Sequence, residues 1–147
     1  MPEELKPPPE QMLLFHLHAK GSQIYTCMNK GGAYAWTLKG PSAQLFDAAG
    51  KQAARHFAGP TWEANDGSRV VGKLAASVPS PDPGSIPWLL LYATANGGSG
   101  SFSKVKTVQR VNTTGGKAPE SGCDDSRQNA ETSVPYEADY YFYGNAR

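Results

Sequence analysis

Glycine and proline interrupt this chain at short intervals, and this spacing limits its possible folds more than any other feature. The 147 residues include 16 glycines and 12 prolines, while charged residues make up only 18% of the chain, below the globular average of about 25%. Glycine favours tight turns and proline breaks helices. The mixture is typical of short strands joined by many turns, and no convincing helical segment is found between them. We therefore expect an all-β protein.

Apolar and polar side chains alternate along the segments between these turns, which is the pattern of half-buried strands. Near the start of the chain, Phe15 and Leu17 would point to one face and His16 and His18 to the other. Residues 20–22 are then predicted to form a turn because they contain a glycine. About nine strands are expected in this way: 12–19, 23–28, 33–38, 43–46, 52–57, 69–75, 88–94, 102–112 and 134–143.

Such a set of strands predicts a single antiparallel domain over residues 12–147, either a closed barrel or a two-sheet sandwich. A chain of this size can enclose one hydrophobic core. Residues 1–11 contain four of the 12 prolines, three of them consecutive. We expect this segment to be an extended N-terminal tether, because proline is incompatible with a helix interior.

Charge and hydropathy argue against nucleic-acid binding and against a transmembrane segment. Lysine and arginine number 14 against 13 aspartates and glutamates, and the densest basic stretch, Lys104 to Arg110, alternates with valine and threonine as an exposed strand face would. Nucleic-acid binding normally needs clustered basic residues. The longest apolar run, residues 86–93, is far shorter than the roughly 20 residues of a membrane span. We expect neither nucleic-acid binding nor a transmembrane segment.

Cys27 and Cys123 are the only cysteines, and both lie beside polar and turn-forming residues. This setting favours a disulfide over two buried thiols, and closing so long a loop would stabilise the fold by on the order of 4–5 kcal/mol. The bond would hold the polar segment 113–133 against the first hairpin. Disulfides belong to oxidising compartments. No signal peptide follows Met1, so we expect the printed sequence to be the mature form of an extracellular or periplasmic protein.

His16 and His18 are a candidate metal-ligand pair. Residues two apart on a strand face the same side, roughly 6.6 Å apart along it. A divalent metal ion could bridge them, with His56 or Glu63 completing a three-ligand site that keeps an open position. The commoner alternative is that both histidines lie on the solvent-facing side of an edge strand. A metal-binding protein or metalloenzyme that uses the three histidines is therefore one hypothesis.

Residues 56–68 hold the densest group of chemically useful side chains. Glu63 and Asp66 could serve as acid and base, with Trp62 stacking on a sugar ring. In the simpler interpretation, Asp66 accepts an Asx-turn hydrogen bond, Trp62 fills the core and Glu63 is solvated. We favour that simpler interpretation over catalysis. No Gly-x-Ser-x-Gly nucleophile motif is present, so the sequence identifies no catalytic residue.

Aromatic side chains are too numerous for one core face, so some should be exposed or line a cavity. In residues 134–143, alternation places Tyr136, Tyr140 and Phe142 on one side and Tyr141 and Tyr143 on the other. The leading hypothesis is a secreted module that binds a saccharide or another small ligand, and a structural or stress-related surface protein is a further alternative. The candidate ligand-binding residues are His56, Trp62, Glu63, Asp66, Trp36 and Tyr141.

Several longer motifs together resemble a known family. They are residues 21–27, Trp36 with Pro41 and Ala43, and the segments 56–68, 86–91, 109–111, 114–116, 122–123 and 135–143. This combination resembles the exported bacterial and fungal proteins grouped as the domain of unknown function DUF3455, over nearly the whole chain after Met12. The resemblance implies export and an ordered β domain and supports the disulfide. It supplies no established activity and no catalytic residues.

Overall fold

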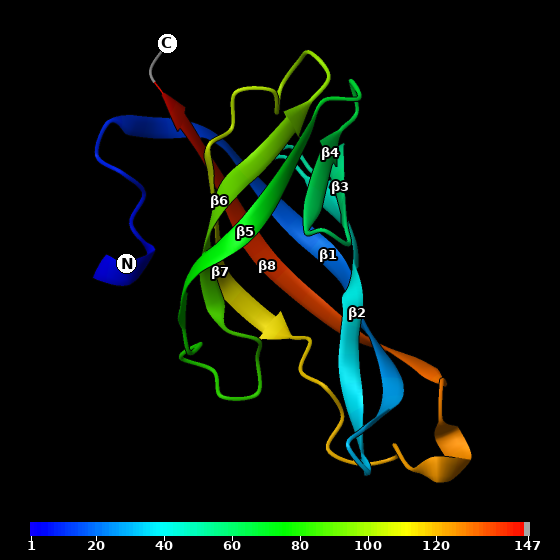
Figure 1. Cartoon of the computed structure of the whole chain (residues 1–147). Coiled ribbons are helices and arrows are strands. Elements are labelled where there is room, and N and C mark those ends of the chain that lie inside the picture. Colours follow the sequence, from blue (N-terminus) through cyan, green and yellow to red (C-terminus); the bar gives the residue numbers. More distant parts are fainter. Residues whose placement is uncertain (146–147) are drawn as a thin grey trace.

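The computed structural model describes residues 1–145, and its strands form one antiparallel sheet closed into a barrel (Figure 1). Neighbours in the sheet follow chain order, and β8 pairs with β1 to close it. The all-β prediction is confirmed, and the sheet is a barrel. Ala146 and Arg147, which end the predicted domain, lie outside the described residues. The strands are β1 (Gln11–Lys30), β2 (Ala33–Phe46), β3 (Gln52–Phe57), β4 (Thr61–Ala64), β5 (Arg69–Val78), β6 (Trp88–Gly97), β7 (Thr107–Gly115) and β8 (Glu131–Asn145).

Gly21 explains one difference from the predicted strands. The turn predicted at residues 20–22 is wrong, because β1 continues through it for 20 residues. Gly21 lies opposite Ala43 of β2 and Tyr136 of β8. A Cβ atom at this position would overlap the carbonyl oxygen of Ser42 and the Cα of Ala43. The glycine is needed for this close approach of two backbones, and it forms no turn.

Two further differences bring the number of strands in residues 1–145 to eight. The predicted strands 33–38 and 43–46 are one strand, β2, which contains a bulge where Ile24 lies opposite Gly40 and Tyr25 opposite Leu38. Such a bulge bends a strand without ending it. The additional strand, β4, follows Pro60 and has only four residues. That length is too short for an alternating pattern to be recognised.

The core lies inside the barrel, where aromatic rings from several strands meet. Trp62 of β4 contacts Tyr140 and Phe142 of β8 edge-on, and Phe102 stacks on Phe142 with ring centroids 4.8 Å apart. The side chains of Tyr136, Tyr140 and Phe142 all belong to this core. The alternation predicted for β8 is therefore confirmed.

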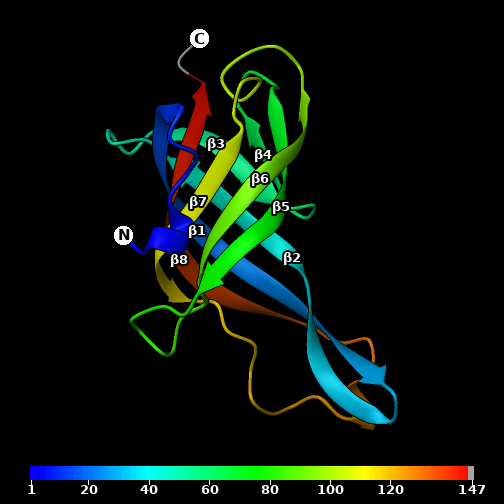
Figure 2. The same ribbon diagram turned by 60° about the vertical axis from the view of Figure 1, so that its left-hand side comes forward.

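The N-terminal segment lies against the outside of the barrel (Figure 2). Leu5, in the short 3-10 helix η1 (Glu3–Leu5), is completely buried and clusters with Leu90 of β6 and Val111 of β7. The amide of Gln109 donates a hydrogen bond of 2.7 Å to the Leu5 carbonyl. Leu5 thus fixes this proline-rich segment to the outer surface of β6 and β7.

A disulfide joins Cys27 and Cys123, as predicted, across 96 positions of sequence. It links the far end of the β1–β2 hairpin to the long connection between β7 and β8. Two backbone hydrogen bonds strengthen the link, because the Cys27 amide donates to Ala130 and the Cys27 carbonyl accepts from Asn129. The connection also carries the second 3-10 helix, η2 (Asp125–Arg127). Residues 1–145 include no helix with the length and hydropathy of a membrane span.

Candidate functional site

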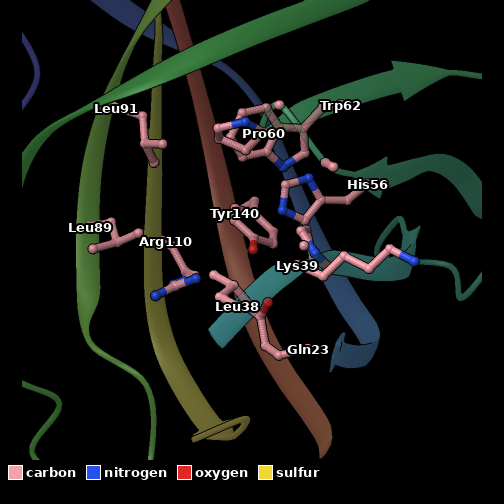
Figure 3. Close-up of a pocket in the computed structure, with 14 residues that line it drawn as sticks. Gln23, Leu38, Lys39, His56, Pro60, Trp62, Leu89, Leu91, Arg110 and Tyr140 are labelled. Carbon is pink, nitrogen blue, oxygen red and sulfur yellow. The ribbon is translucent and has the colours of Figure 1, made fainter. Parts of the chain in front are cut away.

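A cavity of about 250 Å³ lies inside the barrel beside the β3–β4 hairpin (Figure 3). Its position follows from unequal strand lengths. The β3–β4 hairpin turns at residues 58–60, whereas β2 extends well beyond its last pairing with β3, at Ala43. The cavity lies between this hairpin turn, β2 and β6, and residues of seven strands line it. The lining residues are Gln23, Leu38, Lys39, Gly40, Pro41, His56, Ala58, Gly59, Pro60, Trp62, Leu89, Leu91, Arg110 and Tyr140.

His56 is a buried, neutral histidine in the cavity wall. It lies opposite Trp62 in the β3–β4 pairing, and the two rings stack with centroids 4.4 Å apart. Its Nδ1 lies 2.8 Å from the carbonyl oxygen of Thr61. Because a carbonyl only accepts, Nδ1 carries the hydrogen and Nε2 is left as an acceptor. Burial, assisted by the positive charge of Arg110, lowers the pKa of His56 to about 3.

Arg110 brings a positive charge into the same cavity. It is only 9% exposed and follows the core residue Val108 by two positions on β7, so its side chain points inward. Its Nε and Nη2 donate hydrogen bonds of 3.1 and 2.9 Å to the carbonyl oxygen of Pro87. No carboxylate within residues 1–145 forms an ion pair with it. The guanidinium group is therefore held in place by a neutral acceptor.

Tyr140 forms the back wall of the cavity, and its hydroxyl lies 3.1 Å from that of Tyr136. Burial raises the pKa of both phenols, so both are protonated at neutral pH. Two other lining groups are polar and incompletely bonded. Oε1 of Gln23 and Nε1 of Trp62 are buried and have no hydrogen-bond partner among the described residues.

The structure places two of the six predicted ligand-binding residues, His56 and Trp62, in this cavity. Glu63 faces the opposite side of β4, where it pairs with Arg55 (Nε to Oε1, 2.7 Å). Asp66 lies in the β4–β5 turn and accepts a hydrogen bond of 2.9 Å from the Ser68 amide, as in the Asx turn predicted for it. Neither carboxylate lines the cavity.

Trp36 and Tyr141, the other two predicted residues, also lie away from the cavity. The indole Nε1 of Trp36 donates a hydrogen bond of 2.9 Å to the carbonyl of Ser121 and so fixes the long connection against β2. The ring of Tyr141 stacks on His16 with centroids 4.3 Å apart. Trp36 therefore has a structural contact with the long connection, and Tyr141 has one on the outer face of the sheet.

The three histidines lie on two faces of the sheet. His56 contacts Tyr140, which points inward, whereas His16 contacts Tyr141, which points outward from the next position of β8. His18 lies on the same outer face as His16, where both imidazoles contact Asp139. Within residues 1–145 no group of three or more histidine, cysteine, aspartate or glutamate side chains is arranged to hold a metal ion. Metal binding by the histidines stays a prediction.

The outer cluster of His16, His18, Glu137 and Asp139 is held together by short contacts. His18 donates from Nδ1 to Asp139 over 2.9 Å and from Nε2 to Glu137 over 2.8 Å. These two hydrogen bonds raise the pKa of His18. Burial alone would raise the pKa of Asp139, but hydrogen bonds from His18, Asn112 and His16 hold it below its usual range.

Gln23 and Arg110 are two polar residues of the cavity that sequence reasoning did not select. The alternation of residues 104–110 predicts an exposed face for Arg110, and this prediction is wrong because Arg110 is buried. The signal for its true position was Val108, because residues two apart on a strand share a face and Val108 is in the core. Gln23 gave no signal, because it is a polar residue directly after the predicted turn at residues 20–22 and begins the strand expected there.

The fold and the cavity define a class, which is a small eight-stranded antiparallel barrel with one disulfide and an internal pocket. The chain matches the model of DUF3455, described as a protein of unknown function, over residues 7–144. The chain belongs to this family, and the match includes all eight strands of the barrel apart from the last residue of β8. No curated protein matches the chain.

Proposed function

We propose that this barrel binds a small molecule with a largely apolar body in the cavity around His56, Trp62 and Tyr140. The observation that carries the proposal is the cavity itself, whose walls are mostly apolar and aromatic and include a few polar side chains, as is usual in small-molecule sites. Gln23, His56 and Arg110 are the polar side chains that could orient a ligand there.

The cavity walls support a small ligand with an apolar surface. Its volume of about 250 Å³ exceeds the roughly 150 Å³ of a cavity that holds benzene and is just below the usual range of small-molecule sites. Leu89 and Leu91 face the stacked rings of His56 and Trp62 across it (Figure 3). A saccharide needs many polar contacts, and these walls offer few. They favour one substituted ring or a short chain.

A cavity-blocking variant tests this function. Leu89→Trp fills the cavity from β6, and Leu74→Trp is the matched control because Leu74 is 55% exposed on β5. We would screen a panel of small aromatic and aliphatic compounds and monosaccharides by thermal shift and measure the hits by calorimetry. A ligand that binds the native fold raises its melting temperature. We expect hits that bind the wild type and L74W equally and L89W at least tenfold more weakly.

Two outcomes would count against this function. If no compound of the panel raises the melting temperature, binding is contradicted. Hits that bind L89W and the wild type equally would place their site outside the cavity. Preferential binding of monosaccharides would keep the cavity as the site and replace the apolar ligand class by the saccharide class.

We further propose that the protein works in an oxidising compartment outside the cytoplasm. The support is the disulfide between Cys27 and Cys123, because such bonds persist mainly in exported proteins. The test is mass spectrometry of the protein taken from its native cells, with free thiols blocked at lysis. We expect no labelled cysteine, and labelling of both would contradict this location.

A further inference from the structure

We propose that the ligand of the cavity is an anion, namely a carboxylate on a single ring or short aliphatic body, and that its charged group binds Arg110. This inference rests on the proposed function, since it names the ligand class of the same cavity. Its starting point is the burial of Arg110, which is only 9% exposed and lines the cavity wall.

A buried positive charge is costly unless a negative charge compensates it. The carbonyl of Pro87 accepts from two guanidinium nitrogens, but it is neutral, so it satisfies hydrogen bonds without balancing the charge. None of the carboxylates in residues 1–145 pairs with Arg110. The compensating group is therefore missing from the described part of the chain.

The other ionisable side chains near Arg110 do not supply the negative charge. They are Tyr25, Tyr136, Tyr140 and His56, and each lies within the electrostatic reach of Arg110. Burial raises the pKa of the three tyrosines and lowers that of His56, so all four are neutral at pH 7. Among residues 1–145, Arg110 is therefore a cation in the interior without a compensating negative charge.

The nearest acidic residues of β8 are occupied on the outer face of the sheet. Asp139 lies opposite Val111, the neighbour of Arg110, but it bonds to His16, His18 and Asn112. Glu137 accepts from His18 over 2.8 Å. Because successive side chains on a strand point to opposite faces, the wall of the barrel separates these carboxylates from the cavity.

The arrangement of the lining residues also suits an amphipathic acid. In Figure 3, Trp62 and Pro60 lie at the top, Gln23 lies at the bottom, and Arg110 and Tyr140 lie between them. The planar guanidinium matches the two oxygens of a carboxylate. The ring or chain would then occupy the space between the leucines of β6 and the His56–Trp62 stack. A second positive group, the ammonium of Lys39, is paired outside with Glu131 at 2.6 Å.

The first test compares acids with their neutral isosteres on the wild-type protein. Benzoate, 3-phenylpropanoate and hexanoate would be titrated by calorimetry at pH 7.5, each against its primary amide. Hydrogen bonds to charged groups are roughly twice as strong as neutral ones, so we expect at least one acid to bind tenfold or more tightly than its amide. L89W should lose this binding if the acid occupies the cavity.

The second test removes the charge. Arg110→Met keeps the length of the side chain, and we expect it to bind the acid and the amide equally, while Arg110→Lys retains part of the preference. The matched control is Arg69→Met, because Arg69 is half-exposed beside Glu63 on the outer face. It should keep the full preference for the acid.

These outcomes separate the anion proposal from the proposed function. If neutral compounds bind the cavity and the acids show no advantage over their amides, the anion proposal is wrong and small-molecule binding stands. If nothing binds in the wider panel, both are wrong. A preference for acids that R110M retains would also contradict the role of Arg110. Should R110M fail to fold, the comparison of acids and amides on the wild type decides the question.

Discussion

The pKa of a histidine is shifted in opposite directions on the inner and outer faces of the barrel. His56 points inward, stacks on Trp62 and has a pKa lowered to about 3. His18 points outward, lies between two carboxylates and has a raised pKa. One face therefore excludes a positive histidine, and the other stabilises one.

This contrast shows that the charge of a histidine follows from the face of the sheet it occupies. The inner face keeps His56 neutral by burial and already contains the uncompensated Arg110. The outer face places Asp139 and Glu137 beside His18, and water is close to all three. Predictions about the two faces can therefore be tested with paired substitutions.

The two faces should differ most in the stability lost when an aromatic side chain is truncated to alanine. Trp62→Ala removes the largest fully buried side chain of the core, and such truncations cost about 3–5 kcal/mol. Tyr92→Ala, at a position 45% exposed on β6, should cost less than about 1 kcal/mol. Urea denaturation with a fluorescence or circular dichroism readout gives both values. Similar losses in the two variants would contradict the assignment of inner and outer faces.

A smaller difference is expected in how the stability of the wild type and of a His56 variant changes as the pH falls. Because the pKa of His56 is lowered, the unfolded chain takes up a proton below its own value of about 6.5 while the folded chain does not, so stability falls as the pH falls. His56→Asn removes this titration and can still donate to the Thr61 carbonyl. Between pH 6.5 and 5, the wild type should lose about 2 kcal/mol more than H56N. Parallel losses in urea denaturation would show that His56 is accessible to protons in the folded state.

The smallest effect is expected at His18, and its sign is opposite. A raised pKa means that the folded state holds the proton more tightly, so the stabilisation is complete below pH 6.5 and disappears as the pH rises through the folded pKa. His18→Gln should destabilise the protein at pH 5.5 by less than about 1 kcal/mol, because solvent screens the partly exposed pair. At pH 8.5 the loss should vanish.

A double-mutant cycle gives the control for His18. In the presence of Asp139→Asn, H18Q should have a much smaller effect at pH 5.5, since the main partner is already gone. A cost of H18Q that is constant with pH, or that grows toward pH 8.5, would contradict the raised pKa.

Local patterns in the sequence predicted most of the strands and, in β8, the faces of their side chains. Tyr136, Tyr140 and Phe142 point inward as their alternation indicates, and Cys27 pairs with Cys123 as their polar setting indicates. These features depend on neighbouring residues and on a count of two cysteines. They do not require knowledge of which strands pair.

The cavity depends on pairings between distant segments, and for that reason it was predicted only in part. His56 and Trp62 were recognised as candidates because they lie close together in sequence. Arg110 joins them only when β7 takes its place in the closed sheet. Gly21 predicts a turn when only its neighbours are considered, because the strand that a Cβ atom would clash with begins at Ala33, after the turn between β1 and β2.

The disulfide also determines how the molecule would respond to a protease. The exposed, proline-rich segment 79–84 lies between Cys27 and Cys123. A single cut there severs the polypeptide, yet the two pieces stay covalently attached through the sulfur atoms. The strands of the two pieces also stay hydrogen-bonded to each other in the barrel. On a denaturing gel the nicked protein would run as one band until a reductant splits it into two.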